Sequence, residues 1–403
     1  MKSARAFCCA ALAALSAAAG AQPAKVSGDV VRIGVLTDLS GFLSDFTGPG
    51  AVTAVKMAVE DFGGKVLNKP IEVVAGDNLN KPDVAATLAR TWFDTQQVDM
   101  IIDLGNSATG LAAAHVAAEK KRIAIATSPG TTRLTNENCS PTTVHYAYDT
   151  YALSAGTVDT LVKQGLDSWY FLTIDFAGGH AIEKDAAAFV NAGGGKVLGA
   201  ARHPIDTSDF SSYVLQAQAS KAKVVGFATA GQSAINAIKT AGEFGLGKGK
   251  ALAGLYVFIT DVHALGLKVA QGMYVTTGFY WDRDEASRKW SRRYFEKTRR
   301  MPSMIQAADY SATMHYLKAI EAAGTDDSAA VMQKMKEMPI NDFFATNGKI
   351  RADGRMLHDM FLAQVKTPAQ SRYPWDYYTI KAVIPAEQAF QSLAKGACAL
   401  TPK

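Results

Sequence analysis

Short, uninterrupted apolar runs alternate with amphipathic stretches along most of this chain. Val31–Thr37 has the composition of a buried strand, and the helical pattern after it places apolar residues from Val52 to Phe62 on one face before Gly63 and Gly64 end it. The same cycle resumes after Asp149. Continuous apolar strands separated by helices are typical of parallel sheets that are covered on both faces, so the pattern predicts an α/β fold.

The length of the chain, 403 residues, exceeds the usual size of one hydrophobic core. We therefore expect two doubly wound lobes with parallel sheets, joined by a hinge of several crossing segments near Tyr148–Thr150, Thr277–Tyr280 and His358–Gln364. The expected division is residues 30–148 plus 278–358 for lobe 1, residues 149–277 plus 359–385 for lobe 2, and residues 386–403 for a C-terminal tail. The other expected strands are Ile71–Ala75, Met100–Leu104, Ile123–Thr127, Trp169–Ile174, Lys196–Ala201, Val224–Ala228, Leu252–Phe258 and Met273–Thr277.

The segment after residue 340 has a different texture. Asn347-Gly348 and Asp353-Gly354 are strong signals for tight turns. They predict a small β appendage over Asn341–Met356 that ends in a long apolar strand, Met360–Val365.

The N-terminus has the three parts of an export signal. Lys2 and Arg5 supply positive charge, Ala6–Ala19 is an uncharged run, and Ala19-Gly20-Ala21 offers the small residues that signal peptidase requires. The pattern predicts cleavage after Ala21 and a periplasmic protein. A membrane anchor is the alternative, although the run is short and rich in alanine for spanning a bilayer.

The charge balance argues against nucleic acid as a partner. The net charge is +5, and two of the positive charges leave with the signal. The densest basic run, from Arg288 to Arg300, also contains Trp290 and Tyr294, so we interpret it as the solvated face of an amphipathic helix.

Two cysteines remain after processing, Cys139 and Cys398. In an exported protein two cysteines most simply form one disulfide, and two buried free thiols are the alternative.

Signatures of enzymes and metal sites are incomplete. Gly105–Gly110 contains Ser107 two residues after a glycine, but the second glycine comes one residue later than the G-x-S-x-G pattern of a nucleophile elbow requires. The seven histidines form no H-x-x-x-H or H-E-x-x-H pair, so we expect no metal. Gly48-Pro49-Gly50 is followed by Thr53 in place of the third glycine of a dinucleotide fingerprint, and we expect no cofactor.

Loops beyond the carboxyl ends of the predicted strands are rich in Gly, Ser, Thr and Asn. In open parallel sheets ligands bind at this edge, where backbone N–H groups and hydroxyls at helix N-termini attract anions. Simple turn and capping roles are the alternative. Seven aromatic residues near these loops could wall an apolar ligand or could only pack in the core: Phe42, Phe46, Phe176, Tyr256, Phe258, Tyr280 and Trp281.

Several motifs occur in an order that resembles the exported substrate-binding proteins of ABC importers, in the branch of the leucine/isoleucine/valine-binding proteins. They are Ile33-Gly34-Val35-Leu36 with Leu39-Ser40-Gly41, the helix from Gly50 to Val59, Pro70-Ile71-Glu72-Val73-Val74, Thr173-Ile174-Asp175 with Gly179, and Thr207-Ser208-Asp209-Phe210. The resemblance spans Val31 to about Ile384 and implies a monomeric type I bilobal receptor, not an enzyme, that closes on a small solute and docks on membrane permease subunits.

The resemblance also implies a set of binding residues. Lobe 1 would hold a solute carboxylate with Asn106, Ser107, Ala108, Ser128, Gly130 and Thr131, and lobe 2 would close with Asp175, Phe176, Ala230, Gly231 and Tyr256, while Phe46 adds an aromatic wall. Amino-acid binders of this family use an acid of lobe 2 to hold the solute ammonium, and the matching position falls near Tyr256.

No acid lies beside Tyr256 in the sequence. This difference from the amino-acid binders favours an apolar or aromatic carboxylate over an α-amino acid as the solute, unless Asp45, Asp175 or Asp261 supplies the negative charge. Three alternatives stay open: a branched-chain or other amino acid or amide as solute, a secreted α/β hydrolase that uses Ser107, and a sensor subunit with the same fold.

Overall fold

The computed structural model describes residues 26–401. The export signal and its cleavage site after Ala21 lie outside these residues, so both stay predictions. Within the described part of the chain, no helix combines the length and the apolar composition that crossing a membrane requires.

The first lobe is built on a six-stranded sheet with the order β2-β3-β1-β4-β5-β6. All neighbours run parallel except the short β2, which forms a hairpin with β3. The strands are β1 (Val31–Thr37), β2 (Lys65–Val66), β3 (Lys69–Asp77), β4 (Met100–Asp103), β5 (Ile123–Ala126) and β6 (Thr143–His145).

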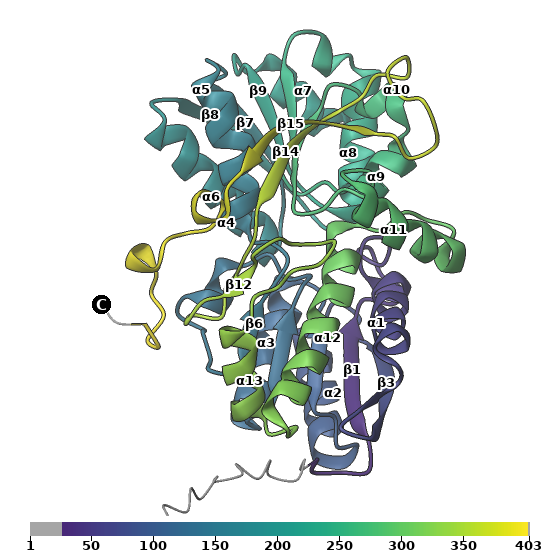
Figure 1. The fold of residues 1–403 in the computed structure, drawn as a ribbon. Coiled ribbons are helices and arrows are strands. Elements are labelled where there is room, and N and C mark those ends of the chain that lie inside the picture. The colour runs from purple at the N-terminus through teal and green to yellow at the C-terminus, as the bar shows by residue number, and fades with distance from the viewer. Residues whose placement is uncertain (1–25, 402–403) are drawn as a thin grey trace, which may run out of the picture.

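Helices from both ends of the chain cover this sheet. α1 (Gly48–Phe62) packs against α12 (Met304–Ala323), and α2 (Pro82–Thr95) packs against α3 (Ser107–Glu119). α11 (Glu285–Thr298) contacts α1 near the junction of the lobes, and α13 (Ser328–Glu337) packs against α12 (Figure 1). α11 buries Trp290 and Tyr294 and exposes Lys289, Arg292 and Lys297, which confirms the amphipathic interpretation of this helix. Arg288 and Arg293 are half-buried in ion pairs, and Arg299 and Arg300 follow the end of the helix.

The second lobe is built on a seven-stranded sheet with the order β15-β14-β11-β10-β9-β7-β8, in which β14 is Met360–Val365 and β15 is Tyr378–Ile384. Its parallel strands are β7 (Ser168–Ile174), β8 (Lys196–His203), β9 (Val224–Ala228), β10 (Ala251–Gly254) and β11 (Tyr274–Thr277). The covering helices are α4 (Thr150–Ser154), a π-helical turn (Ala155–Asp159), α5 (Thr160–Lys163), α6 (Ala177–Ala192), α7 (Ser211–Ala219), α8 (Gly231–Glu243), α9 (Ile259–Leu265), α10 (Leu267–Ala270) and α14 (Ala386–Ala389).

The chain passes between the two sheets three times, after β6, after β11 and before β14, as the fold prediction expects. Figure 1 shows these segments converging between the lobes. The α/β fold with two mostly parallel sheets is confirmed, whereas the residue limits assigned to each lobe stay a prediction.

Two expectations about strands are wrong. β14 (Met360–Val365) does not end the β appendage, which contains only β12 (Lys349–Ile350) and β13 (Met356–Leu357). Instead β14 pairs antiparallel with β11 and with β15 (Tyr378–Ile384) in the second sheet, because its apolar residues are buried on both faces there. The strand expected over Leu252–Phe258 ends at Gly254, and Phe258 becomes the N-cap residue of α9.

Cys139 and Cys398 form a disulfide, with their Cα atoms 5.6 Å apart. The alternative of two free thiols is therefore wrong. The bond connects the C-terminal tail to the segment between β5 and β6 of the first lobe.

Two carboxyl groups lie fully buried beneath the loop that follows β4. Asp103 accepts hydrogen bonds from the Gly105 N–H and from the Thr47 hydroxyl, and burial raises its pKa to about 7. Asp309 on α12 accepts a hydrogen bond of 2.5 Å from the Thr127 hydroxyl, and its other oxygen has no partner among the described residues. Burial and the neighbouring Asp103 charge raise the pKa of Asp309 well above its usual range.

We predict that Asp309→Asn flattens the pH dependence of stability. The folded protein keeps a proton on this carboxyl group at pH values where the unfolded chain has lost it. The free energy of unfolding therefore falls as pH rises above about 4, by up to about 1.4 kcal/mol per pH unit for one retained proton. The asparagine variant should match the wild type near pH 4 and exceed it near pH 8 in urea titrations.

Asp29→Asn is the matched control, because the Asp29 side chain is fully exposed. It should leave the pH profile unchanged. A profile for Asp309→Asn that runs parallel to that of the wild type would show that Asp309 is ionised in the folded protein.

Candidate functional site

The loop between β4 and α3 brings one free hydroxyl to the gap between the lobes. Asn106 is the N-cap of α3, and its side-chain oxygen accepts hydrogen bonds from Ala108 N (2.9 Å) and Thr109 N (3.1 Å). Its amide group also donates to Asn80 Oδ1 (3.1 Å). Ser107 is fully buried, and its Oγ has no hydrogen-bond partner among the described residues. The capping bonds therefore commit Asn106 and the Ala108 N–H to the loop itself, whereas the Ser107 hydroxyl is left facing the Tyr256 phenol of the second lobe.

The loop after β5 supplies a second free hydroxyl. Ser128 is 2% exposed, and its Oγ also lacks a partner within residues 26–401. Gly130 accepts a hydrogen bond from Thr150 N (2.8 Å), and Thr131 caps the following 3₁₀ turn, Thr132–Thr135. The buried His145 ring holds the same loop through a 2.6 Å bond from Nε2 to the Pro129 carbonyl.

The second lobe faces these loops with Phe176, Gly231 and Tyr256. Phe176 precedes α6, and its ring meets Phe42 of the first lobe edge-on at 6.2 Å between centroids. Gly231, with Ala230 before it, starts α8. Gly231 has a φ of +58°, and a Cβ there would lie 2.2 Å from the Phe42 carbonyl oxygen, so only glycine allows this approach.

Tyr256 reaches furthest into the first lobe. Its hydroxyl lies 3.1 Å from that of Tyr148, and Tyr148 donates a 2.6 Å hydrogen bond to the Ser128 carbonyl oxygen. A Cβ on Gly130 would lie only 2.6 Å from the Tyr256 hydroxyl. Burial raises the pKa of both phenols, so both stay neutral. The lobes are therefore closed on each other, with the Tyr256 phenol beside the serine loops.

Aromatic rings from both lobes close the rest of this crevice. Phe46 of the first lobe meets Phe258 at 4.6 Å between centroids, and Phe258 also contacts Tyr148 (5.8 Å) and Tyr256 (5.8 Å). Tyr280 and Trp281, the other aromatics expected near the loops, instead pack against Tyr378 and Tyr373.

Three acids could hold a solute ammonium, and in the described structure each of them already has a partner inside the protein. Asp45 forms an ion pair with Arg300 (2.8 Å), and the exposed Asp175 pairs with His180 (2.7 Å). Asp261 is buried and accepts a hydrogen bond from the Phe258 N–H (2.8 Å), and burial raises its pKa to about 7.

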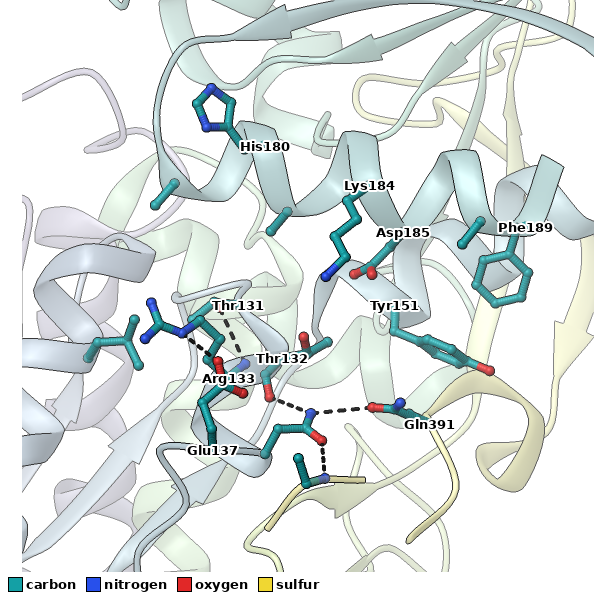
Figure 2. Close-up of a pocket in the computed structure, with 16 residues that line it drawn as sticks. Thr131, Thr132, Arg133, Glu137, Tyr151, His180, Lys184, Asp185, Phe189 and Gln391 are labelled. Carbon is teal, nitrogen blue, oxygen red and sulfur yellow. Dashed lines mark hydrogen bonds and ion pairs between the residues drawn. The ribbon is translucent and has the colours of Figure 1, made fainter. Parts of the chain in front are cut away.

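A groove of about 570 Å³ runs beside the crevice (Figure 2). Thr131 and Arg133 of the first lobe line one side, and Lys184 and Asp185 of α6 line the other. Gln391 of the C-terminal tail forms part of its wall. Arg133 is paired with Glu137, and Asp185 accepts a 2.6 Å hydrogen bond from the Thr150 hydroxyl.

The sequence pattern predicts Tyr148 as part of the hinge but not as part of the binding site, and it does not predict this groove. Tyr148 lies in the first segment that crosses between the lobes, and its position in a predicted hinge was the one signal available. The groove depends on the path of the C-terminal tail, which periodicity does not give. Among residues 26–401, no cluster of three or more His, Cys, Asp or Glu side chains could hold a metal ion.

We predict that Gly231→Ala prevents full closure of the two lobes. The added Cβ would collide with the Phe42 carbonyl oxygen, which belongs to the backbone and cannot rotate away. Small-angle X-ray scattering should show a larger radius of gyration than for the wild type.

Gly272→Ala is the matched control, because Gly272 also has a positive φ (+80°) but nothing lies within 4 Å of its Cβ position. Both variants carry the strain of a left-handed alanine, roughly 1–2 kcal/mol. Equal scattering from the two variants would contradict the closed packing described above.

Comparison with known proteins matches this geometry to a family. A family model described as periplasmic binding protein matches residues 30–371. A periplasmic binding protein from Burkholderia mallei is 54% identical, with a TM-score of 0.89 and coverage of 92% of this chain and 99% of that one. No curated protein matches.

Two further solved structures share the fold. A branched-chain amino acid ABC transporter periplasmic ligand-binding protein from Burkholderia xenovorans is 37% identical, with a TM-score of 0.83 and coverage of 92% of this chain and 99% of that one. A solute-binding protein from R. palustris in complex with benzoate is 18% identical, with a TM-score of 0.82 and coverage of 92% and 100%. The family match and the two closer structures show that this chain belongs to the periplasmic binding proteins, in the type I branch that contains solute-binding proteins of ABC transporters.

Proposed function

We propose that this protein is a periplasmic receptor that binds a small organic acid with an apolar or aromatic body and delivers it to the permease subunits of an ABC importer at the inner membrane. The observation that carries the proposal is a pair of buried serine hydroxyls, Ser107 and Ser128, that lack partners in the described structure and belong to neighbouring loops of one crevice. A buried hydroxyl without a hydrogen-bond partner lowers the stability of the folded protein, so the presence of two such hydroxyls at one site indicates that a ligand supplies the missing partner.

A carboxylate suits these donors. Ser107 is the first residue of α3, and Ser128 follows the adjacent strand β5. The positive end of a helix dipole favours an anion, and hydrogen bonds to a charged acceptor are stronger than those to a neutral one. Gly178, in the first turn of α6, lies close to Ser107 across the crevice, with its Cβ position 3.4 Å from Ser107 Oγ. The N-termini of α3 and α6 therefore approach the same point.

The aromatic rings define the body of the solute. Phe42, Phe46, Phe176 and Phe258 bring apolar faces and edges to the crevice from both lobes. In the closed form the Tyr256 phenol fills the space beside Gly130. A solute therefore binds after the lobes separate and takes the place of this self-contact.

The partners of the three nearby acids argue against an α-ammonium group. Asp45, Asp175 and Asp261 each have a partner inside the protein, and using one for the solute would cost that interaction. The complex of the R. palustris protein with benzoate shows that this fold accommodates an aromatic acid. The printed description of the B. xenovorans protein supports the alternative, a branched-chain amino acid.

A hydrolase that uses Ser107 has less support. A nucleophilic serine needs a general base within hydrogen-bond reach, and Ser107 Oγ has no partner in the described residues. The buried His145 contacts the other serine loop, where its Nε2 is bonded to the Pro129 carbonyl. We therefore propose that the protein is not an enzyme. On its family membership and its small net charge, we also propose that it acts as a monomer without nucleic acid as a partner.

We predict that Ser128→Ala weakens binding of the solute roughly tenfold or more, because a hydrogen bond to a charged group contributes about 1.5–3 kcal/mol. Phe176→Ala should weaken aromatic acids more than short aliphatic acids, because it removes ring contact and leaves the carboxylate donors in place. Calorimetry with benzoate, hydroxybenzoates, short dicarboxylates, amides and α-amino acids tests both changes.

Ser208→Ala, at an exposed position, is the control and should bind like the wild type. Tight binding of leucine, with no measurable binding of aromatic acids, would overturn the ligand class and leave the receptor function intact. If no compound of the panel gives a binding signal, and the protein hydrolyses an ester in a reaction that Ser107→Ala abolishes, then both the ligand class and the receptor function are wrong.

A further inference from the structure

The C-terminal tail makes a fourth connection between the lobes. After β15 in the second sheet, α14 packs beside α4 and the π-helical turn of the second lobe. The chain then leaves that lobe and runs along the side of the molecule to the first lobe (Figure 1). There Cys398 is bonded to Cys139. We call residues 386–398 the strap.

Polar contacts hold the strap to the first lobe before the disulfide is reached. Arg351 Nη1 donates a 2.8 Å hydrogen bond to the Gln391 carbonyl oxygen. The Asn136 side chain donates to Gln391 Oε1 (3.3 Å) and accepts from Ala397 N (2.8 Å). Figure 2 shows Gln391 at the wall of the lateral groove, facing the side formed by the first lobe. The strap is thus bound along its length and not only at its end.

Phe390 of the strap packs onto the hinge. Its ring is 2% exposed and lies over the guanidinium group of Arg355, 4.5 Å from the ring centroid, with His358 at 5.4 Å. Arg355 is itself 1% exposed, and burial lowers its pKa to about 10. A desolvated cation over an aromatic face is a stronger contact than the same pair in water.

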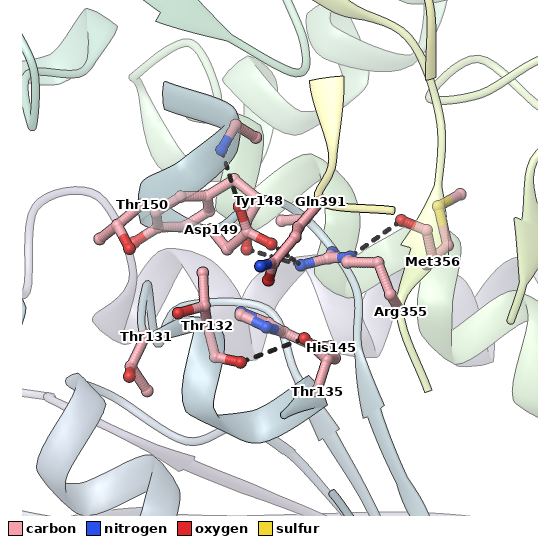
Figure 3. Close-up of polar contacts among 12 residues, drawn as sticks. Thr131, Thr132, Thr135, His145, Tyr148, Asp149, Thr150, Arg355, Met356 and Gln391 are labelled. Atoms are coloured by element: carbon pink, nitrogen blue, oxygen red, sulfur yellow. Dashed lines mark hydrogen bonds and ion pairs between the residues drawn. The ribbon is translucent and has the colours of Figure 1, made fainter. Parts of the chain in front are cut away.

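Arg355 and His358 fasten the first crossing segment. Arg355 Nη1 donates to the Tyr148 carbonyl oxygen (3.0 Å) and forms an ion pair with Asp149 (3.4 Å). Figure 3 shows Arg355 reaching across to Tyr148 and Asp149. His358 Nε2 lies 2.7 Å from the Ala147 carbonyl oxygen. The Tyr148 side chain, in turn, donates to the Ser128 carbonyl oxygen in the crevice. Direct contacts therefore run from the strap through Arg355 and Tyr148 to the candidate binding loop.

We propose that the strap limits how far the two lobes open and keeps the hinge residues Arg355 and Tyr148 in their positions beside the solute crevice. Three crossing segments alone would let the lobes swing apart about the hinge. The disulfide fixes the far end of the strap on the first lobe, and Phe390 fixes its middle on Arg355, so opening must stretch the strap or pull this ring out of its site. The inference concerns regulation of the site in the proposed function, and its test requires no solute.

The test compares two variants that break the strap at different points. Cys139→Ser combined with Cys398→Ser removes the covalent tether, and Phe390→Ala removes the hinge contact and keeps the disulfide. Hydrogen exchange, followed by mass spectrometry, should show residues 146–150, 277–280 and 357–360 exchanging roughly three- to tenfold faster in each variant. The radius of gyration of solute-free protein should increase in both.

Leu393→Ala is the control within the strap, because Leu393 is 38% exposed, and it should behave like the wild type. If the double serine variant folds poorly, wild-type protein treated with a dithiol reductant replaces it in the experiment. The disulfide takes two electrons and two protons to give two thiols, the reductant becomes a cyclic disulfide, and near-ultraviolet circular dichroism verifies the native packing. Unchanged exchange at the three crossing segments, or acceleration spread evenly over the whole protein, would overturn the proposal.

Discussion

The crevice depends on the direction of the strands in the two sheets. In each lobe the carboxyl ends of the parallel strands deliver loops to the same side, and the crossing segments turn these two sides toward each other. Ser107 and Ser128 follow β4 and β5 of one sheet, while Phe176 and Gly231 follow β7 and β9 of the other. Residues from distant parts of the chain therefore meet without any long loop. The approach of Gly231 to the Phe42 carbonyl shows how closely the lobes fit.

Periodicity was enough to predict the parts of the fold that depend on local pattern. Val224–Ala228 and Trp169–Ile174 are buried on both faces and have the continuous apolar composition that burial demands. The apolar pattern predicts Met360–Val365 as a strand but not its partners, because β14 pairs with β11 across a long stretch of chain. The strand expected over Leu252–Phe258 was too long because buried loop residues are as apolar as strand residues.

The candidate site was predicted less completely than the fold. The loops after the strands were identified because Ser, Gly and Thr follow apolar runs, but the sequence could not distinguish a capping side chain from a free one. Asn106 and Thr131 turned out to cap helical turns, whereas Ser107 and Ser128 have no partner in the described residues. Tyr148 is expected as a hinge residue but not as a site residue, because its role in the crevice depends on the buried Arg355 that holds the crossing segment. Buried contacts between distant segments of this kind leave no local pattern in a sequence.

Native mass spectrometry of protein purified from the periplasm is the most direct test of the central claim, that two closing lobes bind one organic acid through the serine loops. We expect one small molecule per chain, retained under gentle ionisation and released on unfolding, with the mass of an organic acid that has no amino group. Ser128→Ala should reduce its occupancy. A bound α-amino acid, or full occupancy in the Ser128→Ala variant, would contradict the claim.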